Sequence, residues 1–436
     1  MLVLARPTFA GDVRYRITDL TEIAEGIGVV QAEARSVNAR GQVVGFELLP
    51  EFEARIVVWD ADLTPSFVDP LPGDNTTIAN LIGDDGTIYG QSVKVTVERI
   101  GHQIRVYLVE KAAYWRGGDV FNLNDEVTHG GEGINLHFIR GMDDTGRLLG
   151  YAGSKQGPPY RPFGFLFDEG VVTDLGALAR PEAMNHRNQI VGYSGSGQDK
   201  AYLWDDGNLV NLHDHENIGG VTSRAYDIND DAMIVGEVQF HISKPEEPAV
   251  WIEGVPTRLV PDINRPQGVA YRILDDGTII GWFNDLDDLE SPWIGAMWKD
   301  GERIELLDLV DPEEGWGFVF PFDINEDGVI VGGGMRNGRI GRAFLMTPIM
   351  ACGGRERIAS ARCSDRGGRT LLKIRLKGGA PGDTFTVTAE GGVQGGGVVG
   401  PKGKAKARLR GVPGGAGAAR AEWGCGAQAE RRYECP

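Results

Sequence analysis

The residue pattern best suited to metal chemistry is Asp323-x-Asn325-x-Asp327, which is followed directly by Gly328. Alternating carboxylate and amide oxygens in a tight loop suit a hard cation such as Ca²⁺. A calcium loop of this kind also needs a bidentate carboxylate at its twelfth position, which here is Gly334. Asn and Asp stabilise turns without metal, by hydrogen bonding to their own backbone. The pattern therefore leaves a metal-free turn, which the missing carboxylate favours, and a calcium site at those three residues.

A second candidate for metal binding is the pair His213 and His215. Two imidazoles that are two residues apart can face one side of a strand and bind a transition metal, but no third ligand can be assigned. A surface loop is the favoured interpretation. The chain has no Gly-x-Ser-x-Gly, no His-Glu-x-x-His and no phosphate-binding loop, and its carboxylates are too numerous to nominate an acid and a base. The sequence therefore leaves the catalytic residues unknown, and no organic cofactor is expected.

The cysteines are confined to the last 85 residues of the chain. An even number in one small segment predicts two disulfides and an oxidising compartment, with three connectivities open. A zinc site is disfavoured because this segment has no Cys-x-x-Cys and no histidine. The four residues are Cys352, Cys363, Cys425 and Cys435.

Charge divides the chain at the same place. Residues 1–350 have a net charge of −27 and residues 351–436 a net charge of +9, which gives the total of −18. An acidic segment of this size repels a phosphate backbone, so nucleic acid is not expected as a partner. No run of eighteen apolar residues occurs, so no membrane span is expected either. The apolar run in Met1–Pro7 is shorter than a signal-peptide core, so no leader is visible in this chain.

The elements that carry these residues come from an internal repeat. Its clearest copy is Phe322–Gly332, in which Asp-Gly between two apolar runs predicts a β-hairpin. Seven copies align on the glycine that ends the second strand, at spacings of 45, 60, 42, 44, 45 and 51 residues. This spacing has room for about four short strands per copy, as in a propeller blade. The seven glycines are Gly45, Gly90, Gly150, Gly192, Gly236, Gly281 and Gly332.

A third strand follows each glycine and usually ends in an aromatic residue. We expect these large side chains to pack between neighbouring sheets, with a ligand-stacking surface as the alternative. A fourth strand follows in six copies only, and Tyr15–Leu20 matches its pattern. If that segment joins the last copy, every sheet has four strands and the ring closes. The third strands end at Trp59, Trp115, Phe167, Trp204, Trp251, Trp298 and Met346.

The repeat resembles the HAF-repeat family of probable extracellular repeat proteins, which is named for a His-Ala-Phe triplet. Arg342-Ala-Phe-Leu-Met, Lys200-Ala-Tyr-Leu-Trp and the Ile-Asn-x-x-Gly-x-Ile-Val-Gly runs are similar to its motif over about residues 14–346. The histidine of the triplet is absent from every copy, so no role for it can be transferred. The resemblance implies a β-propeller-like repeat domain and no particular activity.

We therefore expect an all-β protein with a seven-bladed β-propeller closed by an N-terminal strand. Residues 1–11 are expected to be a flexible N-terminus, 12–348 the propeller, and 349–436 a Gly-rich basic β domain, sandwich-like and stabilised by disulfides. The second copy has extra alternating residues at 93–99 and 104–109, which predict a lengthened hairpin that could dock a partner by edge pairing.

The leading functional hypothesis is a non-catalytic extracellular or cell-surface protein, monomeric, that binds a protein or glycan through propeller loops. The alternatives are a glycan hydrolase or lyase with its site in the central channel, and a calcium-stabilised structural module. The fold alone does not decide between them, because propellers host both enzymes and scaffolds. Clustered carboxylates with raised pKa in the channel would favour the enzyme.

Overall fold

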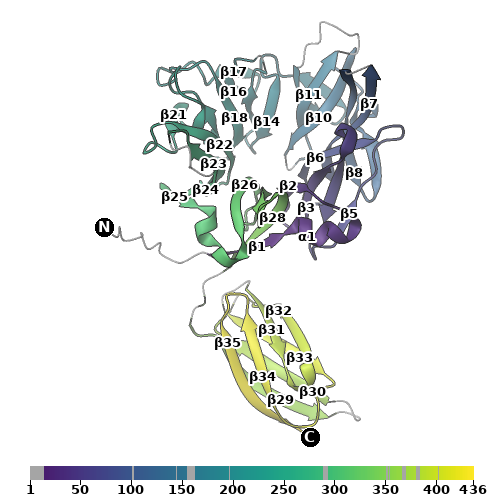
Figure 1. Cartoon of the computed structure of the whole chain (residues 1–436), viewed down its shortest axis with the longest axis vertical. Helices are drawn as coiled ribbons and strands as arrows, with labels where there is room; N and C mark the ends of the chain where they lie inside the picture. The colour runs from purple at the N-terminus through teal and green to yellow at the C-terminus, as the bar shows by residue number, and fades with distance from the viewer. Residues whose placement is uncertain are drawn as a thin grey trace. The chain divides into compact units, whose positions relative to one another are not determined.

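A computed structural model gives the fold of the chain (Figure 1). It describes residues 14–100, 103–143, 145–154, 163–195, 197–287, 293–349, 352, 354–365, 370–379, 383–400 and 402–436. The expected flexible segment 1–11 and the tip of the expected long hairpin lie outside the described residues. The chain divides into two compact units, a large one of Ile17–Thr347 and a small one of Pro348–Pro436 grouped with Met1–Arg16. Both units are built from β-sheets.

Within the described residues, the large unit contains seven four-stranded sheets in a propeller-like arrangement. Six of the sheets each use four consecutive strands. The first three are β2 (Ala32–Val37), β3 (Val43–Leu48), β4 (Ala54–Trp59) and β5 (Pro65–Phe67); β6 (Thr76–Ile82), β7 (Ile88–Ile100), β8 (Gln103–Arg116) and β9 (Asp119–Asn122); and β10 (Ile134–Met142), β11 (Leu148–Ser154), β12 (Phe163–Asp168) and β13 (Val171–Asp174). The next three are β14 (Arg180–Met184), β15 (Gln189–Tyr193), β16 (Ala201–Asp205) and β17 (Asn208–Asn211); β18 (Ser223–Ile228), β19 (Ile234–Val238), β20 (Glu247–Ile252) and β21 (Val255–Arg258); and β22 (Pro266–Ile273), β23 (Ile279–Asp285), β24 (Ile294–Lys299) and β25 (Glu302–Glu305).

The seventh sheet combines the two ends of the large unit. Its order is β1 (Arg14–Asp19), β28 (Arg339–Ile349), β27 (Ile330–Arg336) and β26 (Trp316–Ile324). The short helix α1 (Leu20–Ala24) follows β1 and is capped by the Asp19 carboxylate, which accepts a hydrogen bond from the Glu22 N–H. The first strand of each sheet contacts the first strand of the next, and β26 contacts β2 (Figure 1). Short 3₁₀ turns lie at Glu25–Ile27, Pro50–Phe52, Leu123–Asp125, Leu306–Leu309, Pro312–Glu314 and Glu390–Gly392.

Glycine stands at the repeat position for the same steric reason in every sheet. Each first strand carries a β-bulge, and the glycine of the second strand pairs with the residue just before that bulge, as Gly45 does with Ala34. A Cβ on Gly45 would lie 1.9 Å from the Glu33 carbonyl oxygen, and the other six repeat glycines would meet the equivalent carbonyl at 1.9 to 2.1 Å. Only glycine permits this backbone approach.

The repeat asparagine joins neighbouring sheets. The Asn38 side chain accepts a hydrogen bond from the Gln42 N–H within its own turn and donates one to the Gly83 carbonyl in the next sheet. Asn185 and Asn229 do the same toward their next sheets, and Asn325 donates to the Asn38 carbonyl, which links the seventh sheet to the first. One residue type therefore closes the hairpin and fixes the adjoining sheet.

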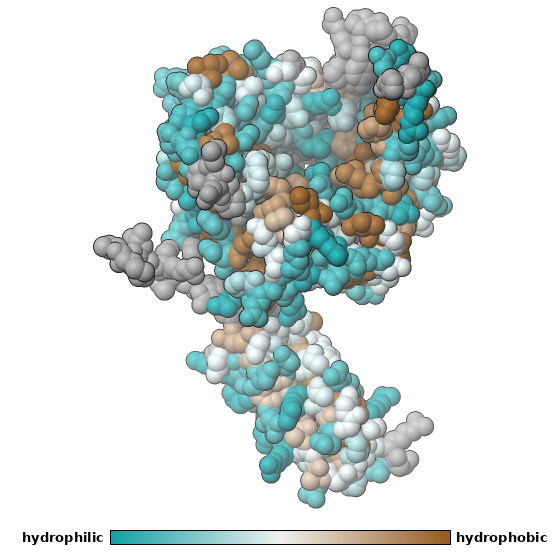
Figure 2. All heavy atoms as spheres, in the orientation of Figure 1, coloured by the Kyte–Doolittle hydropathy of each residue, from teal (hydrophilic) through white to brown (hydrophobic). Residues whose placement is uncertain are grey.

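The aromatic side chains that end the third strands lie between sheets, as predicted. Trp59 and Trp251 are fully buried, and Trp115 and Trp298 are nearly so. Trp59 packs with Leu345 and other residues of the seventh sheet, and its indole N–H donates to the Leu20 carbonyl. These rings are core residues, so they do not form an exposed stacking surface. Outside the core, Figure 2 shows mostly hydrophilic residues with scattered apolar ones.

The small unit is a sandwich of two antiparallel sheets. One has the order β29 (Arg357–Asp365), β30 (Thr370–Lys377) and β33 (Lys404–Arg410); the other has the order β32 (Gln394–Val398), β31 (Thr384–Thr388), β34 (Gly415–Trp423) and β35 (Gln428–Cys435). Both contribute to one core around Leu372, Phe385 and Trp423. The two predicted disulfides are present, and they join Cys352 to Cys425 and Cys363 to Cys435.

Candidate functional site at the centre of the large unit

The three residues predicted as a calcium site have protein partners. Asp323 accepts hydrogen bonds from the Val37 N–H at 3.0 Å and from Arg272 Nε at 3.1 Å. Asn325 closes the turn by accepting from the backbone N–H groups of Asp327 and Val329. The Asn325 contacts stabilise a turn, and the Asp323 contacts link neighbouring sheets. They leave Asp327 as the exposed member of the three.

The other metal candidates are also held locally. Nδ1 of His213 lies 2.8 Å from the Ser223 hydroxyl, and Nδ1 of His215 accepts from the Asn217 N–H. Among the described residues, the one close group of three His, Cys, Asp or Glu side chains is Cys352, Glu356 and Cys425, whose two sulfurs form a disulfide. The two histidines are therefore not brought together with a third ligand.

A different set of residues converges at the centre of the large unit. The β-bulge of each first strand presents one residue, and these seven residues form what we call the central ring. Each one lies ten positions before a repeat glycine, so their equivalence is also visible in the sequence. The central ring consists of Arg35, Asn80, Arg140, Glu182, Tyr226, Tyr271 and Phe322.

Neighbouring members of the central ring contact one another. Arg35 lies over the Phe322 ring at 4.3 Å, which joins the first sheet to the seventh. Tyr271 packs against Phe322 and against Tyr226, with ring centroids 5.8 and 5.6 Å apart. Arg140 donates to the Asn80 amide oxygen at 3.1 Å and forms an ion pair with Glu182. The first strands of neighbouring sheets thus meet through aromatic side chains in one part of the ring and through charged side chains in another.

Most charges at this centre are paired. Arg224 pairs with Asp199 and Glu237, Arg272 pairs with Asp323, and Arg35 pairs with Glu33. The side chains of Arg35 and Arg140 are each about a third exposed, at 33% and 31%, so solvent reaches this centre. Arg140 holds Glu182 by two hydrogen bonds, from Nε and Nη2, whereas Arg224 and Arg272 make one hydrogen bond to each carboxylate.

Burial changes the protonation of several groups beside the central ring. It raises the pKa of the Glu237 carboxyl, although the Arg224 guanidinium opposes this shift. It also raises the pKa of the Tyr226 hydroxyl, which donates to Glu237 at 3.2 Å. Burial raises the pKa of Glu110 and lowers the pKa of His137, and Arg180 acts on both groups to favour the deprotonated form. Raised carboxyl pKa values at a partly exposed centre are typical of functional sites.

Arg180 differs from the other arginines at this centre. It lies over the Tyr151 ring at 4.0 Å, and no carboxylate among the described residues is within salt-bridge distance of it. Glu110 and His137 lie beside this pair, with Glu110 Oε2 3.6 Å from His137 Nδ1. We call Glu110, His137, Tyr151 and Arg180 the Arg180 cluster. It draws on the second, third and fourth sheets.

Sequence reasoning missed both the central ring and the Arg180 cluster. The ring had a detectable signal, because its members stand at one fixed distance before the repeat glycine. The Arg180 cluster had none, because its four residues come from three copies and occupy unequal positions in them. Only the sheet-to-sheet packing brings them together.

Comparison with known proteins identifies no family. The chain matches neither a protein-family model nor a curated protein. Solved structures that resemble it include a Mycobacterium tuberculosis puromycin-hydrolyzing peptidase, at 12% identity and a TM-score of 0.45, which covers 86% of this chain and 62% of that one. The chain therefore spans less than two thirds of that peptidase.

Two further resemblances are of the same kind. Virginiamycin B lyase from Staphylococcus aureus has 11% identity and a TM-score of 0.40, over 77% of this chain and 99% of that one. Regucalcin from Agrobacterium tumefaciens, described as a calcium-binding protein, has 13% identity and a TM-score of 0.31, over 72% of this chain and 89% of that one. At these values the resemblance carries no statement about a substrate or a reaction.

Proposed function

We propose that this chain is a non-catalytic extracellular binding protein of the HAF-repeat type, whose large unit is a seven-bladed β-propeller closed by β1 and binds a glycan at its centre. The observation that carries the proposal is the Arg180 cluster. Arg180 has donors that no carboxylate of the described residues occupies, and it lies over an aromatic ring. A free guanidinium beside tyrosine suits a sugar, since its donors meet hydroxyl oxygens and the ring packs on the apolar sugar face.

The paired charges favour binding over catalysis. An acid and a base that act on a glycosidic bond need carboxyl groups free to reach the substrate from two sides. At the central ring, Glu182 is paired with Arg140, and Glu237 with Arg224. These carboxylates act as fixed supports of the arginines. The disulfides of the small unit support an oxidising, extracellular location.

A glycan-binding screen of the full chain tests this proposal. The matched variant is Arg180→Gln, which removes the free guanidinium without leaving a buried carboxylate unpaired. We expect the full chain to retain one class of glycan and Arg180→Gln to retain it at least tenfold less, with an unchanged melting temperature. Equal retention of every glycan class by the two proteins would overturn the central site.

A second candidate function is a glycan hydrolase or lyase, and Glu110 is the observation that favours it. Its carboxyl has a pKa raised by burial and lies 3.6 Å from His137, so these two side chains could act as an acid and a base toward a bound sugar. Turnover of any glycan by the full chain, lost in Glu110→Gln while binding persists, would establish this function in place of the first.

A third candidate is a calcium-stabilised module at Asp323, Asn325 and Asp327. Its support is the alternation of oxygen ligands, and against it stand the hydrogen bonds that Asp323 and Asn325 already make. Calorimetry with Ca²⁺ and melting with a chelator decide this point. Heat on titration together with a lower melting temperature after chelation would support the module.

A further inference from the structure

One face of the small unit is strongly basic. From Leu372 to the end of β30, and throughout β33, side chains alternate between the sandwich core and solvent. The inward residues are apolar, as at Leu372, Ile374 and Leu409. The outward residues of the three-stranded sheet include nine cations, which we call the basic face: Arg357, Arg362, Lys373, Arg375, Lys377, Lys404, Lys406, Arg408 and Arg410.

The strand register sets these cations directly opposite one another. Lys377 faces Lys404, Arg375 faces Lys406, and Lys373 faces Arg408. On the other side of β30, Arg357 faces Lys377 and Arg362 faces Lys373. Like charges directly across a ladder destabilise a sheet. No carboxylate of the described residues lies within salt-bridge distance of these nine side chains.

The second sheet of the same sandwich shows that this bias is local. Its outward residues mix both signs, and Arg420 faces Glu430 across the ladder and pairs with it at 2.8 Å. A surface with such a mixture of charges is sufficient to keep a domain soluble. The uncompensated repulsion on the basic face therefore points to an anionic partner that offsets it.

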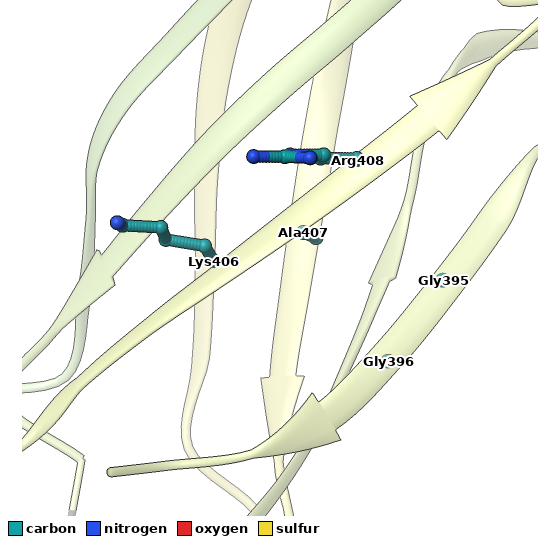
Figure 3. A pocket seen from close by; sticks show the side chains of 5 residues that line it. All are labelled: Gly395, Gly396, Lys406, Ala407 and Arg408. Carbon is teal, nitrogen blue, oxygen red and sulfur yellow. The ribbon is translucent and has the colours of Figure 1, made fainter.

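A pocket of about 400 Å³ adjoins the basic face. It lies between β33, the edge of one sheet, and β32, the edge of the other, and it is lined by Gly395, Gly396, Lys406, Ala407 and Arg408. Figure 3 shows Lys406 and Arg408 projecting to the same side of β33, while the glycines present bare backbone. A polar chain can approach the backbone there and meet cations at the rim.

We propose that the basic face binds a linear acidic polysaccharide. Its cations recur about 7 Å apart along each strand and about 5 Å apart between strands, which forms rows of positive charge. A polymer with an anionic group on every one or two sugars can meet several members of a row at once. The disulfides indicate an oxidising compartment, where such polymers occur outside the cell.

The composition of the basic face argues against two other polyanions. Proteins that bind single-stranded nucleic acid place aromatic rings among their cations for base stacking. Proteins that lie on membranes place apolar side chains among them to enter the lipid. The outward positions of β30 and β33 hold no aromatic ring, and Leu371, which faces Arg410, is the single apolar residue among their Lys and Arg side chains.

Affinity measurements on the full chain test the proposal, with heparin and polygalacturonate as probes. The test variant is Arg375→Gln with Lys406→Gln, which removes one facing pair. The control is Arg420→Gln with Arg432→Gln in the other sheet, which changes the net charge equally. We expect the test variant to bind at least tenfold more weakly and the control to bind as the unchanged chain does. Affinity should also fall steeply with salt.

Three results would overturn the proposal. They are no binding of either polysaccharide at low salt, equal weakening in the two variants, and tighter binding of oligo(dT) or phosphatidylglycerol vesicles than of either polysaccharide. Both the test and the control variant leave every residue of the large unit unchanged. The basic face can therefore fail whether or not the central site binds a glycan.

Discussion

The two units of this chain use charge in opposite ways. At the centre of the large unit, arginines from different sheets are matched with carboxylates, as Arg140 is with Glu182. On the basic face of the small unit, cations face cations, as Arg375 faces Lys406. The first arrangement is complete within the protein, and we propose that the second is completed by a partner. Among the described residues, Arg180 is the central arginine that has no carboxylate partner within salt-bridge distance, so we group it with the basic face.

Breaking a buried pair should have the largest effect. Arg342 and Asp19 join β28 to the end of β1, and their side chains are 6% and 2% exposed. Arg342→Met leaves the buried Asp19 with only Arg336, whose Nη1 lies 3.5 Å away, so the free energy of unfolding should fall by about 3 kcal/mol. Urea denaturation measures this change. Arg420→Met, which removes an exposed pair, is the control and should cost under about 1 kcal/mol.

Loss of a disulfide should affect the small unit alone. Cys363 and Cys435 are 72 residues apart in sequence, so removing both with Cys→Ala changes should cost about 2–5 kcal/mol. Differential scanning calorimetry should show the transition of the small unit shifted down and that of the large unit unmoved. A shift of both transitions would mean that the units do not unfold independently.

The pH dependence of stability should reveal a buried acid in the large unit. Burial raises the pKa of Asp227 to about 6, although Arg272 favours its charged form. The folded-state pKa lies above the unfolded value of about 3.9, so the folded state binds the extra proton between these values. The stability from this group is complete below about pH 4 and is lost as the pH rises to about 6.

Asp227→Asn isolates that contribution. The variant should flatten the fall in unfolding free energy between pH 4 and pH 6 by roughly 1–3 kcal/mol, as measured by urea denaturation at each pH. An amide oxygen can still accept the hydrogen bond from the Ile273 N–H. A profile with unchanged slope would assign the pH dependence to other groups.

The smallest effect should have the opposite sign. Lys406→Gln removes the repulsion with Arg375 across the ladder, so the small unit should gain about 0.2–0.5 kcal/mol. Thermal melting at low salt measures this gain, and added salt should reduce it. A loss of stability on this change would mean that the Lys406 side chain contributes packing that outweighs the repulsion.

Much of the fold could be predicted from the sequence, because the repeat is local. The repeat hairpins follow from Asp-Gly turns such as Asp327-Gly328 between apolar runs, and the burial of Trp59 and Trp251 follows from their place at strand ends. The extended second hairpin also forms, as β7 and β8, with Ile104 and Leu108 more than half exposed. The pairing of the cysteines could not be chosen, since three connectivities were compatible with the spacing.

The candidate site could be predicted much less well. The Asp323 carboxylate suggested metal binding by its spacing, yet it bonds to Arg272 from another sheet and to Val37 from the far end of the chain. Neither partner has a fixed sequence distance from it. The Arg180 cluster has the same origin, because Glu110 and Arg180 become neighbours only when sheets pack.

Isothermal titration of the full chain with the glycan that it retains, followed by mass analysis of the recovered glycan, tests the central claim most directly. We predict a saturable heat that is absent in Arg180→Gln and a glycan recovered intact. An equal heat in Arg180→Gln, or a cleaved glycan, would contradict a non-catalytic site built on the unpaired arginine.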